Sequence, residues 1–136
     1  MNRIFQKLSR DELPQAVYPK SLTVLTKGGI PLTSSSADDV LQGGLYAAIT
    51  SFASDSFQCE LNHIRIGRYL VFFKRTKHLL GSLIVESKKS LNPKIIEVGL
   101  NGLLEHLENN CPEFEREKYD HEKIEDLINQ YVVNLS

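Results

Sequence analysis

The residues of this sequence best suited to binding a metal ion are its two cysteines and four histidines. Cys59 and His63 are four residues apart on a predicted strand, which places them on one face but about 13 Å apart. Zinc needs bonds of about 2.0–2.3 Å to each ligand, so this pair cannot share one ion. His106 and Cys111 are five residues apart on a predicted helix and diverge around its axis. No C-x-x-C or H-x-x-x-H pattern is present, and we expect neither a metal nor any other cofactor.

Motifs of nucleophilic catalysis and of phosphate binding are also missing. There is no G-x-S-x-G pattern, and Ser82 in "LGSL" lies within a predicted apolar strand. The Gly-Gly pairs at 28–29 and 43–44 match neither G-x-x-x-x-G-K-[ST] nor G-x-G-x-x-G. No cysteine has a histidine placed beside it by a known pattern, so we expect buried or half-buried thiols. The sequence therefore predicts a protein that is not an enzyme.

Charge is distributed unevenly along the chain. Residues 59–94 carry eight Lys/Arg against two Glu, whereas residues 95–136 carry three Lys/Arg against ten Asp/Glu. Basic residues beside exposed aromatic side chains are typical of single-strand nucleic-acid binding. Here Tyr69, Phe72 and Phe73 lie in an otherwise apolar run and the pI is about 6.4, so core packing is expected and nucleic acid is not. Two basic loops, the first at a solvated hairpin tip, are candidates for contact with an acidic partner or anionic lipid heads: Lys74, Arg75, Lys77, Lys88 and Lys89.

Length and composition predict one soluble domain. The 136 residues are 41% hydrophobic and 24% charged, which is ordinary for a globular chain with a single core. No apolar run approaches the roughly 20 residues that span a bilayer, and the N-terminus lacks an apolar signal core. Two cysteines are too few for a disulfide framework, which favours a cytoplasmic location. We expect a polar lead-in over residues 1–19 and a single domain over residues 20–136.

The stretch "SLTVLTKGGIPLTSSSADDVLQGGLYAAITSF" predicts a hairpin followed by a helix. Glycine at 28 and 29 tolerates the positive φ of a tight turn. Gly43 and Gly44 each cost about 1 kcal/mol relative to alanine within a helix, so they indicate either close approach to a sheet or a break in the helix. The helix carries one apolar stripe: Leu41, Leu45, Ala48, Ile49 and Phe52.

Three strands and two helices are predicted for the rest of the chain. Residues 58–86 form a meander in which "YLVFF" is apolar on both faces and therefore central. Asn92 and Pro93 are typical of the N-cap and first position of a helix, and Asp120 caps a last helix. The order is thus β-β-α-β-β-β-α-α. The stripes of the two helices are Ile96, Leu100, Leu103, Leu107 and Cys111, then Ile124, Leu127, Ile128 and Tyr131.

This element order resembles that of longin domains, which are α/β (α+β), profilin-like sandwiches with a five-stranded antiparallel sheet flanked by helices. The segments "GLYAAITSFA", "HIRIGRYLVFF" and "LLGSLIVES" are similar to those of small archaeal longin-like proteins, and the resemblance covers about residues 20–110. Related roadblock domains place a helix before the first strand pair, so the order favours longin. In this fold the first helix lies against the sheet, where Gly44, Ala47 and Ala48 would let it sit close. The lead-in is longer than in most longins, and no heptad segment or membrane anchor follows, so a role in fusion is not implied.

The resemblance implies a non-catalytic protein-interaction module. Its partners would be small Ras-like GTPases or a trafficking or adaptor-type complex, with homo- or heterodimers of longin or roadblock subunits. Contact would use a sheet edge or the first helix. The predicted contact residues, on the outer side of that helix and on the hairpin, are Gln42, Tyr46, Thr50, Ile30, Leu32 and Thr33. The alternative is a profilin- or PAS-like small-molecule sensor, which needs a cavity with convergent polar groups between sheet and helix.

Overall fold

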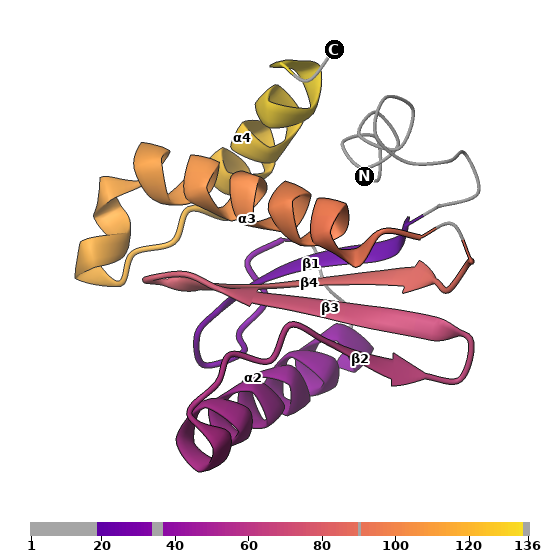
Figure 1. Cartoon of the computed structure of the whole chain (residues 1–136). Coiled ribbons are helices and arrows are strands. Elements are labelled where there is room, and N and C mark those ends of the chain that lie inside the picture. Colours follow the sequence, from indigo (N-terminus) through magenta and orange to yellow (C-terminus); the bar gives the residue numbers. More distant parts are fainter. Residues whose placement is uncertain (1–18, 34–36, 90, 135–136) are drawn as a thin grey trace.

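The computed structural model describes residues 19–33, 37–89 and 91–134. The predicted lead-in lies outside them except for Pro19, which begins the first strand. An antiparallel sheet forms the middle layer, with one helix on one face and the C-terminal helices on the other (Figure 1). The fold is therefore an α+β sandwich, as predicted. Its strands are β1 (Pro19–Thr26), β2 (His63–Ile66), β3 (Tyr69–Arg75) and β4 (Leu79–Glu86).

The strand order β1-β4-β3-β2 places β3 and β4 in the centre of the sheet. Leu70 and Phe72 of β3 face the C-terminal helices, whereas Val71 and Phe73 face the first helix. All four are nearly inaccessible to solvent. The prediction that "YLVFF" is covered on both faces is confirmed, since side chains alternate across a strand.

Local signals define the starts of the C-terminal helices. The Asn92 side chain accepts a hydrogen bond from the Lys94 backbone N–H (3.1 Å), and Pro93 occupies the first turn, where no intrahelical donor is needed. Asp120 accepts from the Lys123 backbone N–H (3.2 Å) in the same manner. The helical segments are α2 (Ala37–Phe57), α3 (Pro93–Asn110), the short 3-10 helix η1 (Pro112–Arg116) and α4 (His121–Asn134).

The sheet has four strands in the described part of the chain, so the predicted count of five is not confirmed. Residues 30–33, expected as the second strand of a hairpin, run beside β1 without forming a ladder. Leu32 N–H donates to the Val24 carbonyl (2.9 Å), and a single bridge joins Leu25 to Pro31. Pro31 has no N–H to donate, which prevents the ladder from continuing there.

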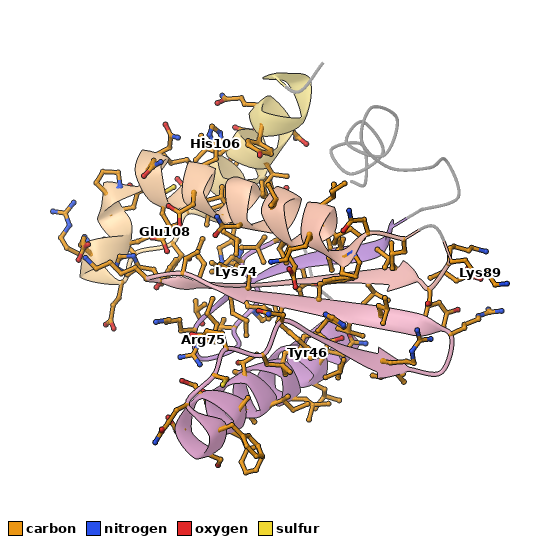
Figure 2. The ribbon with its side chains drawn as sticks, viewed as in Figure 1. Tyr46, Lys74, Arg75, Lys89, His106 and Glu108 are labelled. Atoms are coloured by element: carbon orange, nitrogen blue, oxygen red, sulfur yellow. The ribbon has the colours of Figure 1, made fainter. Side chains whose placement is uncertain are left out.

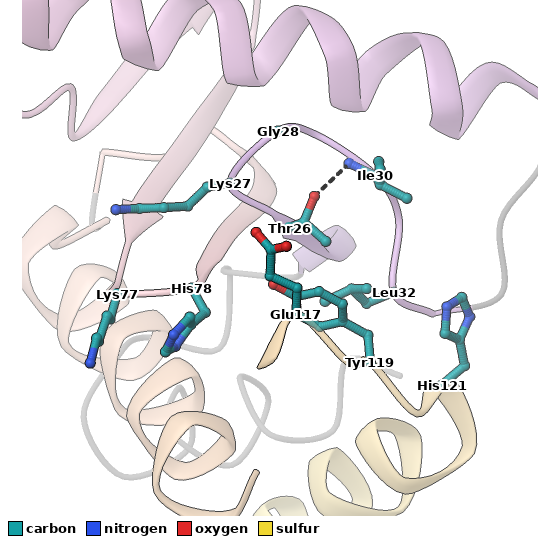
Figure 3. A pocket seen from close by; sticks show the side chains of 10 residues that line it. All are labelled: Thr26, Lys27, Gly28, Ile30, Leu32, Lys77, His78, Glu117, Tyr119 and His121. Carbon is teal, nitrogen blue, oxygen red and sulfur yellow. Dashed lines mark hydrogen bonds between the residues drawn. The ribbon is translucent and has the colours of Figure 1, made fainter. Parts of the chain in front are cut away.

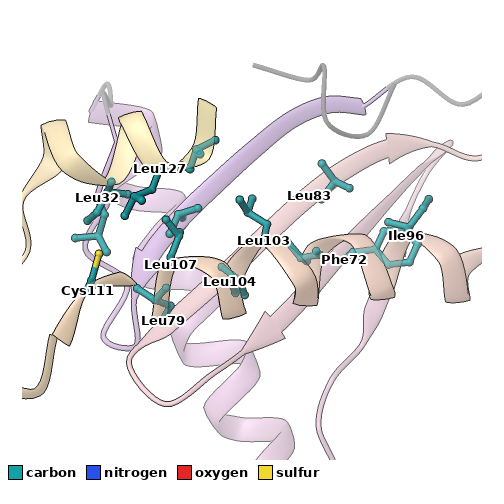
Figure 4. Close-up of a cluster of buried hydrophobic side chains, with 14 of the residues drawn as sticks. Leu32, Phe72, Leu79, Leu83, Ile96, Leu103, Leu104, Leu107, Cys111 and Leu127 are labelled. Carbon is teal, nitrogen blue, oxygen red and sulfur yellow. The ribbon is translucent and has the colours of Figure 1, made fainter. Parts of the chain in front are cut away.

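The larger hydrophobic cluster fills the space between the sheet and the C-terminal helices (Figure 4). The predicted stripe of α3 lies in it, including Cys111, and Ile124 and Ile128 of α4 close its far side. Each fully buried Leu or Ile contributes about 1.5–3 kcal/mol relative to its exposed state. This cluster is the main hydrophobic core, and the leucines of α3 that it buries are Leu100, Leu103, Leu104 and Leu107.

Helix α2 contacts the turn that follows β1 through two glycines, Gly43 of the helix and Gly29 of the turn. A Cβ atom on Gly43 would overlap the Gly29 carbonyl oxygen, and one on Gly29 would overlap the Gly43 carbonyl; Gly29 also has φ +94°. Close approach is confirmed, and α2 runs unbroken, so the alternative of a helix break is wrong. The contact is made by Gly43 and the buried Ala47. Gly44, whose Cβ would meet nothing within 4 Å, and the exposed Ala48 were wrongly expected there.

These two neighbouring glycines should respond to alanine in opposite directions. Gly44→Ala is expected to raise the free energy of unfolding by about 0.5–1 kcal/mol, because helix propensity improves and the space is open. Gly43→Ala is expected to lower it by about 1–3 kcal/mol, because backbone must move to admit the methyl group. Urea denaturation of the matched pair measures both changes. Equal stability of the two variants would contradict the close contact at Gly43.

Candidate functional site

Helix α2 presents bulky apolar side chains to solvent. Leu41, Leu45 and Phe52 are 74%, 56% and 61% exposed, and their spacing places them on one side of the helix. We call these three residues the outer face of α2. Residues 40–54 carry no charged side chain, so this part of the helix surface is apolar or uncharged polar. The predicted stripe is real, but it faces away from the sheet.

The inner side of α2 is made of small residues and one tyrosine. Tyr46 is 8% exposed and its ring meets Phe73 edge to face at 5.1 Å between centroids. Thr50 is 2% exposed, and its hydroxyl donates within the helix to the carbonyls of Tyr46 (2.9 Å) and Ala47 (3.1 Å). The prediction that Tyr46 and Thr50 lie on the outer side is therefore wrong. Small side chains at 43, 47 and 50 allow the backbone to approach the sheet, which the bulkier stripe would prevent.

The other predicted contact residues are divided by burial. Gln42 and Ile30 are exposed and Thr33 is half-buried, so a partner can reach them. Leu32 is 1% exposed within the main core, so its predicted partner contact is wrong. Sheet edges differ as well: residues 30–32 lie along β1, whereas β2 has no strand beside its outer edge within the described sheet.

The predicted basic residues do not form one surface. Lys74, Arg75 and Lys77 lie at one end of β4 and Lys88 and Lys89 at the other, as Figure 2 shows for Lys74, Arg75 and Lys89. The Arg75 guanidinium donates to a carbonyl of α2 (3.2 Å), and Lys77 forms an ion pair with a glutamate of η1. Lys88 lies 3.6 Å from the carboxylate of a β4 glutamate. The two basic loops are separated by the length of β4, because they lie before and after this strand.

The turn between β3 and β4 is held to α3 by Glu108. One Glu108 carboxylate oxygen accepts from the Thr76 hydroxyl (2.6 Å) and the His78 backbone N–H (2.7 Å), and the other lies 2.7 Å from His78 Nδ1. Burial raises the pKa of the Glu108 carboxyl, but these hydrogen bonds outweigh it and leave the pKa below its usual value. His78 and Glu108 have side-chain exposures of 16% and 12%, so the expected solvated hairpin tip is instead a partly buried polar cluster.

A carboxylate that orients a histidine is one part of many general-base sites, and Cys111 lines a small pocket together with this pair. Cys111 is buried, which raises the pKa of its thiol and disfavours the thiolate. Cys59 is exposed, so the expectation of a buried or half-buried thiol is wrong there. No three His, Cys, Asp or Glu side chains in the described ranges are arranged to hold a metal ion. None of the helices described is sufficiently long and apolar to cross a membrane.

A cavity of about 650 Å³ opens beside this cluster, at the end of the sheet (Figure 3). Thr26 and Lys27 at the end of β1, Lys77 and His78 in the β3–β4 turn, and the segment between η1 and α4 line it. The volume falls within the range of about 300–1,000 Å³ that is common for small-molecule sites. The cavity lies at the sheet end rather than between sheet and helix, where the sensor alternative placed it.

The Glu108 cluster predicts a pH-dependent contribution to stability. Because the folded-state pKa is lowered, this contribution is fully present above the usual value of 4.5 and is lost as the pH falls through the lower folded pKa. Glu108→Gln is expected to lower the free energy of unfolding at neutral pH by about 1–3 kcal/mol, with a smaller difference in acid. Urea denaturation across this pH range, with Glu105→Gln on the exposed side of α3 as control, measures it. A difference from wild type that is constant with pH would contradict the assignment.

Comparison with known proteins identifies the fold. No protein-family model matches the sequence, and no curated protein sequence matches it. The structure of the Roadblock/LC7 domain from Streptomyces avermitilis superimposes with a TM-score of 0.58 and 11% identity, covering 80% of this chain and 95% of that one. Myxococcus xanthus MglB gives a TM-score of 0.51 and 15% identity, covering 79% and 94%. At such identities the likeness shows the fold alone; the closeness to archaeal longin-like proteins stays a prediction. The chain has the roadblock/longin type of fold, with an antiparallel sheet flanked by helices.

Proposed function

We propose that this chain is a non-catalytic interaction module that scaffolds or regulates small Ras-like GTPases or a trafficking or adaptor-type complex. Two independent observations support the proposal: the roadblock/longin type of fold, and the outer face of α2. Because one fold hosts many functions, the outer face carries more of the argument than the likeness does. A cytoplasmic location and assembly into a homo- or heterodimer belong to the same proposal.

The outer face of α2 is the observation that carries the proposal. A helix with apolar side chains on both sides is ordinarily covered on both sides, yet the sheet covers only the inner side of α2. Complete burial against a partner would contribute about 1.5–3 kcal/mol to binding for each of the three side chains, Leu41, Leu45 and Phe52. Phe57, 67% exposed, packs edge to face on Phe52 at 5.8 Å and extends the apolar surface to the end of the helix.

A protein partner fits this face better than a lipid surface does. Helices that lie on membranes carry Lys and Arg along the polar side, and α2 has none among residues 37–57. The face is instead an uncharged row of apolar side chains, which suits packing against a second helix. The open edge of β2, where Ile66 is 57% exposed, offers backbone groups for added strand pairing by the same partner.

A small-molecule sensor is the second candidate, and the cavity at the end of the sheet is the observation that favours it. Polar groups from three parts of the chain line this cavity. Binding of a small molecule there would need no partner at α2. The two candidates are compatible, because no residue of α2 lines the cavity.

The docking proposal is tested by placing a charge on the outer face of α2. Tagged wild-type protein is expected to capture a small GTPase, or a second roadblock- or longin-type subunit, from a lysate of the source cell. Leu45→Glu and Phe52→Glu are each expected to reduce that capture at least about tenfold, which corresponds to roughly 1.4 kcal/mol. Quantitative mass spectrometry, in the presence of GDP or a GTP analogue, provides the measurement.

Val98→Glu is the matched control for these variants. Val98 is 70% exposed on α3, so the substitution adds the same charge at an equally exposed apolar position away from α2. Circular dichroism should show that all variants remain folded. Light scattering of the purified proteins then separates self-association from contact with a different protein. Only self-association would give the Leu45→Glu variant a lower molar mass than the wild type. Capture that is unchanged in both α2 variants would refute docking at this face, and capture of no such protein would leave the sensor as the better candidate.

A further inference from the structure

Three segments far apart in sequence build the cavity at the end of the sheet. They are the end of β1 and the turn after it, the β3–β4 turn, and the connection from η1 to α4 (Figure 3). The sheet holds the first two side by side, because Thr26 pairs with Leu79 directly after the β3–β4 turn. Part of the wall is therefore built on paired strands, as a preformed binding site requires.

One side of the cavity carries a histidine held in a fixed orientation. Glu108 is ionised and engages His78 Nδ1, so this nitrogen donates and is unavailable to a ligand. The other nitrogen, Nε2, lies 3.7 Å from the nearest Glu115 carboxylate oxygen, which is beyond hydrogen-bond distance. His78 thus lines the cavity with its ring oriented by Glu108, and Nε2 of the neutral ring can only accept a hydrogen bond.

Two opposite charges face the same cavity and are not used elsewhere. Lys27 and Glu117 have no ion-pair partner among the described residues, whereas Lys77 is paired with Glu115. Figure 3 shows Lys27 toward the side of His78, and the Glu117 carboxylate nearer Thr26. Glu117 has φ +56° because it is the left-handed C-cap of η1, where its N–H donates to the Glu113 and Phe114 carbonyls.

Apolar side chains and hydroxyl groups complete the lining of the cavity. Leu32 is fully buried beneath the cavity, and Tyr119 packs on Phe114 with 5.0 Å between ring centroids. Burial, and then the nearby Glu117 charge, raise the pKa of the Tyr119 phenol, which therefore remains a hydrogen-bond donor. The Thr26 hydroxyl accepts from the Ile30 N–H (3.1 Å) and keeps its own proton to donate.

We propose that this cavity binds a small organic zwitterion, with its phosphate or carboxylate group toward Lys27 and its ammonium group at Glu117. The pairing follows from charge: an anion alone would be repelled by Glu117, and a cation alone by Lys27. This site is separate from the docking face on α2, so either proposal can fail while the other holds.

NMR titration with O-phosphoethanolamine tests the proposal, with ethyl phosphate and ethanolamine as probes that each carry one half of its charge. In ¹H–¹⁵N spectra of the wild type, O-phosphoethanolamine is expected to shift the amides of Lys27, His78 and Glu117 and to bind at least about tenfold more tightly than either half. β-Alanine, compared with propionate, repeats the comparison for a carboxylate. The anion that binds more tightly identifies the group that the site prefers.

Two exposed-residue variants separate the roles of the charges without disturbing the Glu108 cluster. Lys27→Ala should weaken O-phosphoethanolamine and ethyl phosphate alike, by about tenfold. Glu117→Gln should weaken only the zwitterion and leave ethyl phosphate unchanged or tighter. Lys89→Ala, at the opposite end of β4, is the control and should change nothing. The proposal is overturned if no probe shifts the cavity amides at about 10 mM, a concentration that detects even weak binding. Equal binding of the zwitterion and its halves, or binding unaffected by Lys27→Ala, would overturn it as well.

Discussion

The contact between the backbones of Gly29 and Gly43 is the constraint on which the arrangement of this domain depends. It fixes the height of α2 above the sheet, because a side chain at either position would overlap the other residue's carbonyl group. At this height only small or flat side chains fit beneath the helix, which accounts for Ala47, Thr50 and the edge-on Tyr46. The larger apolar residues of α2 are consequently left on the outside. The exposed face proposed for docking thus follows from the same close approach that secures the helix.

Much of the fold could be predicted because its signals are local or strongly periodic. The N-cap Asn92 with Pro93, and the leucine stripe of α3, act through hydrogen bonds and burial that the neighbouring sequence determines. The missing fifth strand had a local warning in Pro31, but whether residues 30–33 form a ladder depends on how they meet β1. Strand pairing is a tertiary property, so the sequence left it undecided.

The candidate site could be predicted only in part, because its position depends on which side of α2 packs. Apolar periodicity located the helix that carries the exposed face, yet it gives most weight to large side chains, and here Leu45 and Phe52 face solvent while Thr50 is buried. A signal was present in the spacing of Gly43, Ala47 and Thr50, a strip of small residues on one side of the helix. The cavity had no such signal, because its walls come from segments about 90 residues apart, brought together by the sheet.

The basic and the acidic parts of the chain come into contact in the folded domain. The basic meander and the acidic C-terminal part meet at one end of the sheet, where Lys77 pairs with Glu115 and His78 with Glu108. The exposed Lys77–Glu115 pair contributes little to stability, about 0–1 kcal/mol, whereas the partly buried Glu108 cluster holds the β3–β4 turn to α3. Lys27 and Glu117 take no part in those pairs, and both line the cavity at the same end of the sheet. These are the two charges that we propose hold the zwitterion.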